Sequence, residues 1–169
     1  MTMDARAIYA SSLRNTHALE QQGLQQMEIQ VSRLERYPDY AALLRRHIEI
    51  TRLQIARLDK ALETLGESPS TIKETVTSVV GTVGATVHAM AQDETLKNLY
   101  AGYAFQYQQI AAYRSLIAIA EAAGETAHTS GFRQSIQEEE AAAQHVAGII
   151  EPVTRRYVEL TTSGDKADR

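Results

Sequence analysis

The chain of 169 residues contains no cysteine and no tryptophan. Without cysteine it forms no disulfide, no thiolate metal site and no cysteine nucleophile, so these three kinds of chemistry are excluded. The length suits one domain with a substantial core. The proportions of hydrophobic residues (44%) and charged residues (22%) are typical of a soluble globular protein.

The sequence also lacks long apolar runs and a strong net charge. No stretch of about 18 apolar residues occurs, so we expect no transmembrane helix and no membrane partner. The N-terminal region has no apolar segment of the secretory type, which predicts a cytoplasmic protein. A net charge of −4 argues against a nucleic-acid partner. No phosphate loop, serine triad or nucleotide fingerprint occurs, so no small-molecule substrate is identifiable.

Apolar residues recur at steps of three and four along most of the chain, which predicts four amphipathic helices. We place these helices over residues 4–35, 39–65, 94–123 and 126–160. Pro38 separates the first two, because the residue before proline disfavours a helix and proline begins one well. Gly66 and Gly124 are natural helix ends. Pro152 should kink or end the fourth helix.

Residues 67–93 differ from the rest of the chain. Thr71-Ile72-Lys73-Glu74 resembles a capping box, and valines from Val76 onward recur at helical spacing. The β-branched residues, with Gly81 and Gly84, also allow a strand. We interpret the segment as a crossover with a short extra helix. It could pack on its own bundle, form a homodimer contact, or serve as the face of a partner-binding helical module.

Two helical hairpins joined by one long crossover are the arrangement of a ferritin-like four-helix bundle. We therefore predict an all-α fold with a single domain over residues 1–160. The small polar residues at 161–169 predict a disordered tail.

Each predicted helix carries a polar side chain near the middle of its apolar face. Glu20 and Gln54 both lie 17 residues from Tyr37, in the first hairpin turn. Gln109 and Glu139 both lie 15 residues from the glycine of the second turn. Residues equidistant from a turn lie at one level of an antiparallel pair. We therefore expect a polar layer inside the core, where an unpaired carboxylate is costly.

A dinuclear metal centre in such a bundle needs about four carboxylates and two histidines, with Glu-x-x-His on two helices. No apolar face of this chain carries that motif. The third helix offers Gln106, Gln108 and Gln109, with no carboxylate between Glu94 and Glu121. Glutamine contributes no negative charge to a site for iron or manganese, which prefer hard anionic oxygen ligands.

Four motifs follow one another along the predicted helices. They are Leu13-Arg14-Asn15 with Glu20-Gln21-Gln22; His47-Ile48-Glu49-Ile50-Thr51 with Gln54 and Arg57-Leu58; Gln106-Tyr107-Gln108-Gln109-Ile110-Ala111 with Tyr113; and Gln137-Glu138-Glu139. In these motifs the chain, over residues 7–155, resembles the YciE/YciF-type proteins, a ferritin-like family of bacterial stress-associated proteins whose biochemical function is unsettled. The resemblance implies a ferritin-like fold, a dimer, and metal ligands among the acidic residues of the motifs.

The departures from the family's pattern bear on function. Glu20 and Glu139 retain two of the implied ligands. Carboxylates are lost at Ile50, Gln106 and Gln109, and a histidine is replaced at Tyr107. Three losses at one layer indicate a degenerate di-metal site, and they argue against oxidase activity.

Two interpretations of the layer remain open. In the first, the protein is a non-enzymatic homodimer without a cofactor, and amide donors with His47 hold the buried carboxylates. In the second, iron or manganese still binds and supports oxidase- or storage-like chemistry. The candidate ligands are Glu20 and Glu139, with Glu49, Gln54, Gln106, Gln109 and Glu138 as neighbours in the degenerate site. His17 and Glu20, three residues apart, could form a further ligand pair.

If the two buried carboxylates lie close together in a dry core, the pKa of at least one should be raised.

Overall fold

The structure, a computed structural model, describes residues 4–67 and 94–168. These residues form four long α-helices and one short 3₁₀ helix, with no strand among them. In chain order the elements are α1 (Ala5–Val31), α2 (Pro38–Thr64), α4 (Glu94–Ala123), η1 (Thr126–His128) and α5 (Thr129–Thr162). The all-α fold is confirmed. The expected crossover helix, its competing strand and the contacts expected there lie at residues 68–93, outside the described residues.

The helix ends follow local sequence signals. The Asp4 carboxylate caps α1 by accepting a hydrogen bond of 2.7 Å from the backbone N–H of Ala7. The helix ends at Val31, earlier than the predicted residue 35, and the Ser32 hydroxyl donates to a carbonyl of its last turn. Helix α2 begins at Pro38, one residue before the predicted start at residue 39.

Gly66 and Gly124 end α2 and α4 as predicted. Their φ angles are 78° and 72°, in the left-handed region that glycine adopts without strain. After α2 the chain closes back on the helix, because the N–H of Glu67 donates to the carbonyl of Leu62 at 3.1 Å.

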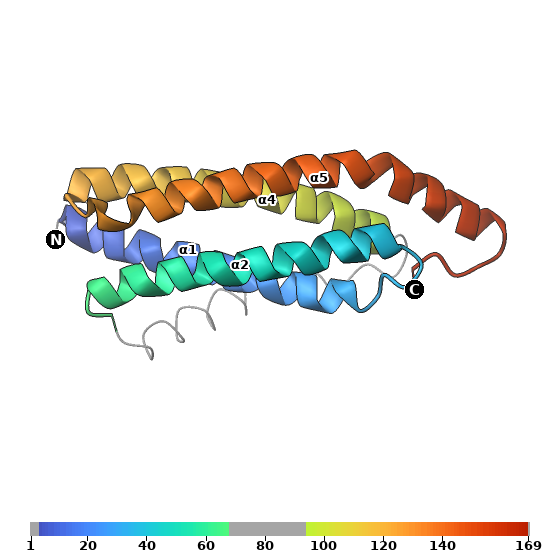
Figure 1. Cartoon of the computed structure of the whole chain (residues 1–169), viewed down its shortest axis with the longest axis horizontal. Helices are drawn as coiled ribbons and strands as arrows, with labels where there is room; N and C mark the ends of the chain where they lie inside the picture. The colour runs from blue at the N-terminus through green and yellow to red at the C-terminus, as the bar shows by residue number, and fades with distance from the viewer. Residues whose placement is uncertain (1–3, 68–93, 169) are drawn as a thin grey trace.

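Helix α5 differs from the prediction at its C-terminal end. It continues through Pro152 to Thr162, so this proline does not end the helix. Figure 1 shows the last turns of α5 inclined to its earlier part. A proline inside a helix removes one hydrogen bond and bends it, and packing of the flanking turns keeps the helix continuous.

The C-terminal tail also differs from the disordered segment that was expected over residues 161–169. The chain turns at Gly164 and returns toward the bundle. Ala167 is buried, and its carbonyl accepts a hydrogen bond of 2.8 Å from the Tyr37 hydroxyl. The Asp168 carboxylate accepts from the backbone N–H of Thr95 at 3.0 Å. These contacts place the chain up to residue 168 against the starts of α2 and α4. No local sequence pattern predicts them.

The four helices form a bundle in which α1 is antiparallel to α2 and to α4, and α5 is antiparallel to both α4 and α2 (Figure 1). Helix α2 ends at one end of the bundle and α4 begins at the other. This placement of the two helix ends agrees with the predicted pair of hairpins. None of the described helices combines the length and apolar character that a membrane span requires.

The apolar core consists of two separate clusters. One cluster includes Tyr9, Leu13, Leu58, Leu62, Tyr113, Leu116 and Phe132. The other includes Leu34, Tyr37, Tyr40, Leu44, Leu99, Val146, Val153 and Leu160. Buried polar residues from all four helices lie between these clusters in the sequence of each helix. The predicted polar layer therefore divides the core into two halves.

Two glycines inside helices give a direct test of packing between α1 and α4. A Cβ atom at Gly23 would lie 2.6 Å from the Phe105 ring, whereas one at Gly148 would meet nothing within 4 Å. We expect Gly148→Ala to stabilise the protein by up to about 1 kcal/mol through helix propensity. Gly23→Ala should destabilise it by about 1 kcal/mol net, because overpacking costs roughly 1–3 kcal/mol. Urea denaturation of the two variants measures both changes in the free energy of unfolding.

Adding Phe105→Leu should remove most of the penalty of Gly23→Ala, because the clash is with this ring. Equal stability of Gly23→Ala and Gly148→Ala would show that α1 and α4 do not approach this closely.

Candidate functional site: a buried acidic layer

All four long helices contribute polar side chains to the middle of the bundle. Glu20 and Glu139 are both 0% exposed, so the two carboxylates predicted to face inward do so. The other buried polar residues of the layer are His47, Thr51 and Gln54 on α2 and Gln106 and Gln109 on α4. Counting residues from the hairpin turns therefore placed the layer correctly.

Glu20 is held by one of the predicted amide donors. The Gln109 Nε2 atom donates to Glu20 Oε2 at 2.7 Å. The other oxygen, Oε1, has no hydrogen-bond partner among the described residues. Burial, and then the nearby charge of Glu139, raises the pKa of Glu20 to about 8. Glu20 therefore binds a proton at neutral pH, in agreement with the raised pKa expected from sequence.

Glu139 lies opposite His47. The Nε2 atom of His47 is 3.4 Å from Glu139 Oε1, within the range of an ion pair when the imidazole is protonated. Neither oxygen of Glu139 has a hydrogen bond of ordinary geometry within the described part of the chain. His47 is therefore the cationic or donor group placed to stabilise this carboxylate.

Tyr113 faces the same layer from α4. Burial, and then the charge of Glu20, raises the pKa of its hydroxyl well above the ordinary value. The hydroxyl has no hydrogen-bond partner of ordinary geometry among described residues. Tyr113 therefore remains a neutral phenol beside Glu20, with an available donor.

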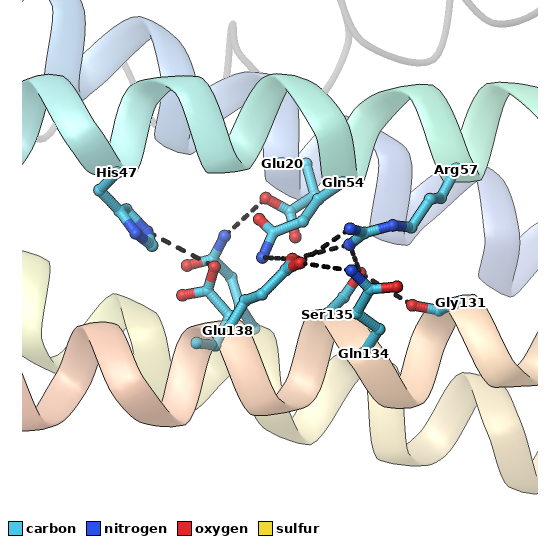
Figure 2. A network of polar contacts seen from close by, with 10 residues as sticks. Glu20, His47, Gln54, Arg57, Gly131, Gln134, Ser135 and Glu138 are labelled. Carbon is cyan, nitrogen blue, oxygen red and sulfur yellow. Dashed lines mark hydrogen bonds and ion pairs between the residues drawn. The ribbon is translucent and has the colours of Figure 1, made fainter.

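Glu138 has a different environment from Glu139. Arg57 donates to both of its oxygens, each at 2.7 Å, in a bidentate pair (Figure 2). Gln54 and Gln134 add hydrogen bonds of 3.2 Å and 3.0 Å. Burial alone would raise the pKa of Glu138, but the hydrogen bonds and charge of Arg57 outweigh burial and lower it. Glu138 is therefore an ionised carboxylate with its acceptor sites occupied.

Several predicted site residues do not join the layer. The side chain of Glu49 is 69% exposed and pairs with Arg52, so its assignment as a neighbour of the site is wrong. It lies five residues before Gln54, which turns it to the outer face of α2. His17 binds Asp59 on α2 at 2.8 Å rather than pairing with Glu20 as a ligand.

The predicted roles of the glutamines are confirmed only in part. Gln109 donates to Glu20, but Gln54 donates to Glu138 instead of to the two central carboxylates. Gln106 is buried, yet its side chain makes no hydrogen bond to any described residue.

Arg57, the group that neutralises Glu138, was not among the predicted site residues. Arg57 lies three residues after Gln54 on the same side of α2, and this spacing is the signal that could have found it. The chain also has one Glu-x-x-His spacing, Glu125 to His128, in the connection to α5. There the two side chains bind Arg6 and Thr64, away from the layer.

The residues present do not fit a dinuclear carboxylate centre. Among the residues that the structure describes, Glu20 and Glu139 are the carboxylates of the layer that no arginine or lysine neutralises, because Glu138 is paired with Arg57 and Glu49 faces outward. Within residues 4–67 and 94–168, no group of three or more histidine, cysteine, aspartate or glutamate side chains is arranged to hold a metal ion. Two divalent ions need more negative charge than two carboxylates supply.

More acceptors than donors are left unpaired in the layer. Buried carbonyl and carboxylate oxygens without partners among the described residues are Glu20 Oε1, Gln54 Oε1, Gln106 Oε1 and both oxygens of Glu139, and the hydroxyls of Thr51 and Tyr113 also lack partners. Unsatisfied buried acceptors are costly, and protons, ordered waters or a single cation would satisfy them.

A family model described as a domain of unknown function (DUF892) matches residues 4–159. The chain belongs to this family. A crystal structure of a protein from Xanthomonas campestris pv. campestris is 26% identical, with a TM-score of 0.77 over 94% of this chain and 98% of that one. The crystal structure of the E. coli stress protein YciF is 16% identical, with a TM-score of 0.68 over 88% of this chain and 96% of that one. The family membership and the shared fold confirm the YciF-type resemblance.

The raised pKa of Glu20 predicts a pH-dependent stability. The folded state keeps a proton on this carboxyl up to about pH 8, whereas the unfolded chain loses it near 4.5. The contribution of the protonated Glu20 to the free energy of unfolding is therefore fully present below pH 4.5 and is lost as pH rises to about 8. The free energy of unfolding of the wild-type protein should therefore fall by on the order of a few kcal/mol between pH 5 and pH 9. We expect Glu20→Gln to abolish this fall. Urea denaturation at both pH values measures it.

Glu140→Gln is the matched control, because this neighbouring carboxylate is exposed and pairs with Arg114. It should leave the pH dependence unchanged. If the stability of Glu20→Gln and wild type fell in parallel with pH, Glu20 would not carry the proton.

The Arg57–Glu138 pair predicts a second effect on stability. Arg57→Met leaves a half-buried carboxylate without its counter-ion, and we expect the free energy of unfolding to fall by about 1–3 kcal/mol. Arg52→Met removes an exposed ion pair with Glu28 and should cost less than about 1 kcal/mol. Adding Glu138→Gln to Arg57→Met should recover part of the loss, because it removes the unpaired charge. Equal losses for the two arginine variants would contradict this assignment.

Proposed function

We propose that this chain is a non-enzymatic member of its family, with a degenerate di-metal site whose carboxylates now form a structural layer. The observation that carries this proposal is the 2.7 Å hydrogen bond from Gln109 to Glu20. It supplies a neutral amide donor to a buried acid, and a proton on Glu20 removes the remaining need for a metal. The layer then helps to fix the register of the helices, because Glu20 binds Gln109 on α4 and Glu138 binds Arg57 on α2.

The proposal also covers the location and assembly of the protein. The E. coli relative of the same fold is described as a stress protein. The family resemblance implies dimers. We therefore propose a cytoplasmic, stress-associated homodimer.

One observation favours a second candidate, in which the layer binds a single divalent ion. Glu20 Oε1 and both oxygens of Glu139 lack partners in the described part of the chain, and His47 lies beside Glu139. Two carboxylates and one imidazole are ligand types suited to iron, manganese or zinc. In the structure these three side chains are not placed around one ion position, so this candidate requires them to move together on binding. Such an ion would displace the proton of Glu20 and would support storage- or oxidase-like chemistry.

Metal analysis separates the two candidates. We expect protein purified from cells supplemented with iron and manganese to carry well below one equivalent of either metal. Restoring carboxylates with Gln106→Glu and Gln109→Glu should raise manganese affinity, because it restores negative charge at the layer. Calorimetric titration and thermal denaturation with added manganese measure this gain.

Gln108→Glu is the matched control. It adds the same charge to α4 at an exposed position and should leave manganese affinity unchanged. Near-stoichiometric iron or manganese in the wild-type protein, lost in the Glu20→Ala and Glu139→Ala double variant, would reject the proposal in favour of the single-ion site.

A further inference from the structure

A cavity of about 370 Å³ opens between α1 and α4. Its volume falls in the range of about 300–1,000 Å³ that is usual for small-molecule sites. Where the cavity meets the acidic layer, its lining is polar and includes Gln106, Gln109 and His47. Its apolar walls include Leu44, Leu99 and Phe105. The cavity therefore combines an apolar body with a polar end.

The polar end contains a buried group without a partner. Gln106 is 5% exposed, and its Oε1 atom has no hydrogen-bond partner among the described residues. His47, which is 4% exposed, has an Nδ1 atom in the same condition. Buried polar atoms of this kind are costly unless another molecule satisfies them. A ligand with a hydrogen-bond donor at this end would satisfy the Gln106 oxygen.

The charges around the cavity favour a cationic donor. Gln109 binds Glu20, and His47 contacts Glu139, so both acids of the layer lie directly behind the polar end. The positive charge of Arg33 at the lining is already paired with Glu94, which lines the cavity too. An anionic head group would face the Glu139 carboxylate without a free counter-ion in the lining, whereas an ammonium group would be attracted to it. Glu20 keeps its proton at pH 7.5 and adds little charge.

From this geometry we propose that the cavity binds a small amphipathic primary amine. The ammonium group lies at Gln106, and the aliphatic body packs against Leu99 and Phe105.

Three probes with six-carbon chains test the head-group chemistry: hexylamine, hexanol and hexanoate. They are titrated by calorimetry against the full chain in a chelator-containing buffer at pH 7.5. We expect hexylamine to bind at least about tenfold more tightly than hexanoate, because only the ammonium gains charge-assisted contacts. Hexanol should lie between them, because it keeps the apolar contacts and a neutral donor.

Two glycine variants test the location. Gly102 lines the cavity, and a Cβ atom there meets nothing within 4 Å. Gly102→Leu should fill the space and abolish binding. Gly148 is equally unhindered but lies on α5, outside the lining, so Gly148→Leu should bind hexylamine as the wild type does.

A readout on the wild-type protein covers the case in which Gly102→Leu does not fold. Amide chemical shifts on addition of hexylamine should change at Gly102 and Gln106 and stay constant at Gly148. Equal affinity for hexanoate and hexylamine, unchanged binding by a folded Gly102→Leu variant, or no binding of any probe up to its solubility limit would overturn the proposal.

Discussion

The bundle depends on how it accommodates two acids in its interior. Glu20 and Glu139 are both fully buried between two apolar clusters. A buried charge is tolerated only when a proton, a donor or a counter-ion compensates for it. Here a proton and an amide stabilise Glu20, and the imidazole of His47 lies beside Glu139. The helix register, the pH dependence and the possible ligands of the layer all follow from this constraint.

Two neighbouring glutamates show how local geometry decides chemistry. Glu138 and Glu139 are adjacent on α5, yet Arg57 takes Glu138 in a bidentate pair while Glu139 points to the centre. A helix turns about 100° per residue, so adjacent side chains meet different neighbours. The arginine therefore removes one carboxylate from the metal-ligand set and leaves the layer with too little negative charge for two ions.

The layer is also incomplete as a structural device. Gln106 lines the cavity between α1 and α4 and makes no hydrogen bond to any residue that the structure describes. A purely structural layer would be expected to satisfy such a group. The unsatisfied amide and the adjoining cavity are the observations from which the amine site is proposed.

Much of the fold was predictable because it rests on local rules. Proline and glycine placed the ends of the helices, and counting from the turns brought Glu20, Gln54, Gln109 and Glu139 to one level. The assignments that failed concern direction around a helix or contacts between distant segments. Glu49 faces outward, His17 binds Asp59, and the tail packs against Tyr37.

The sequence by itself therefore determined the helices, their pairing and the acids that are buried, because periodicity and turn residues act over a few positions. Only the tertiary structure decided which donor serves which acid, and where a cavity remains. Those outcomes depend on contacts of about 3 Å between side chains from four helices. The pattern of residues along the sequence does not specify such contacts.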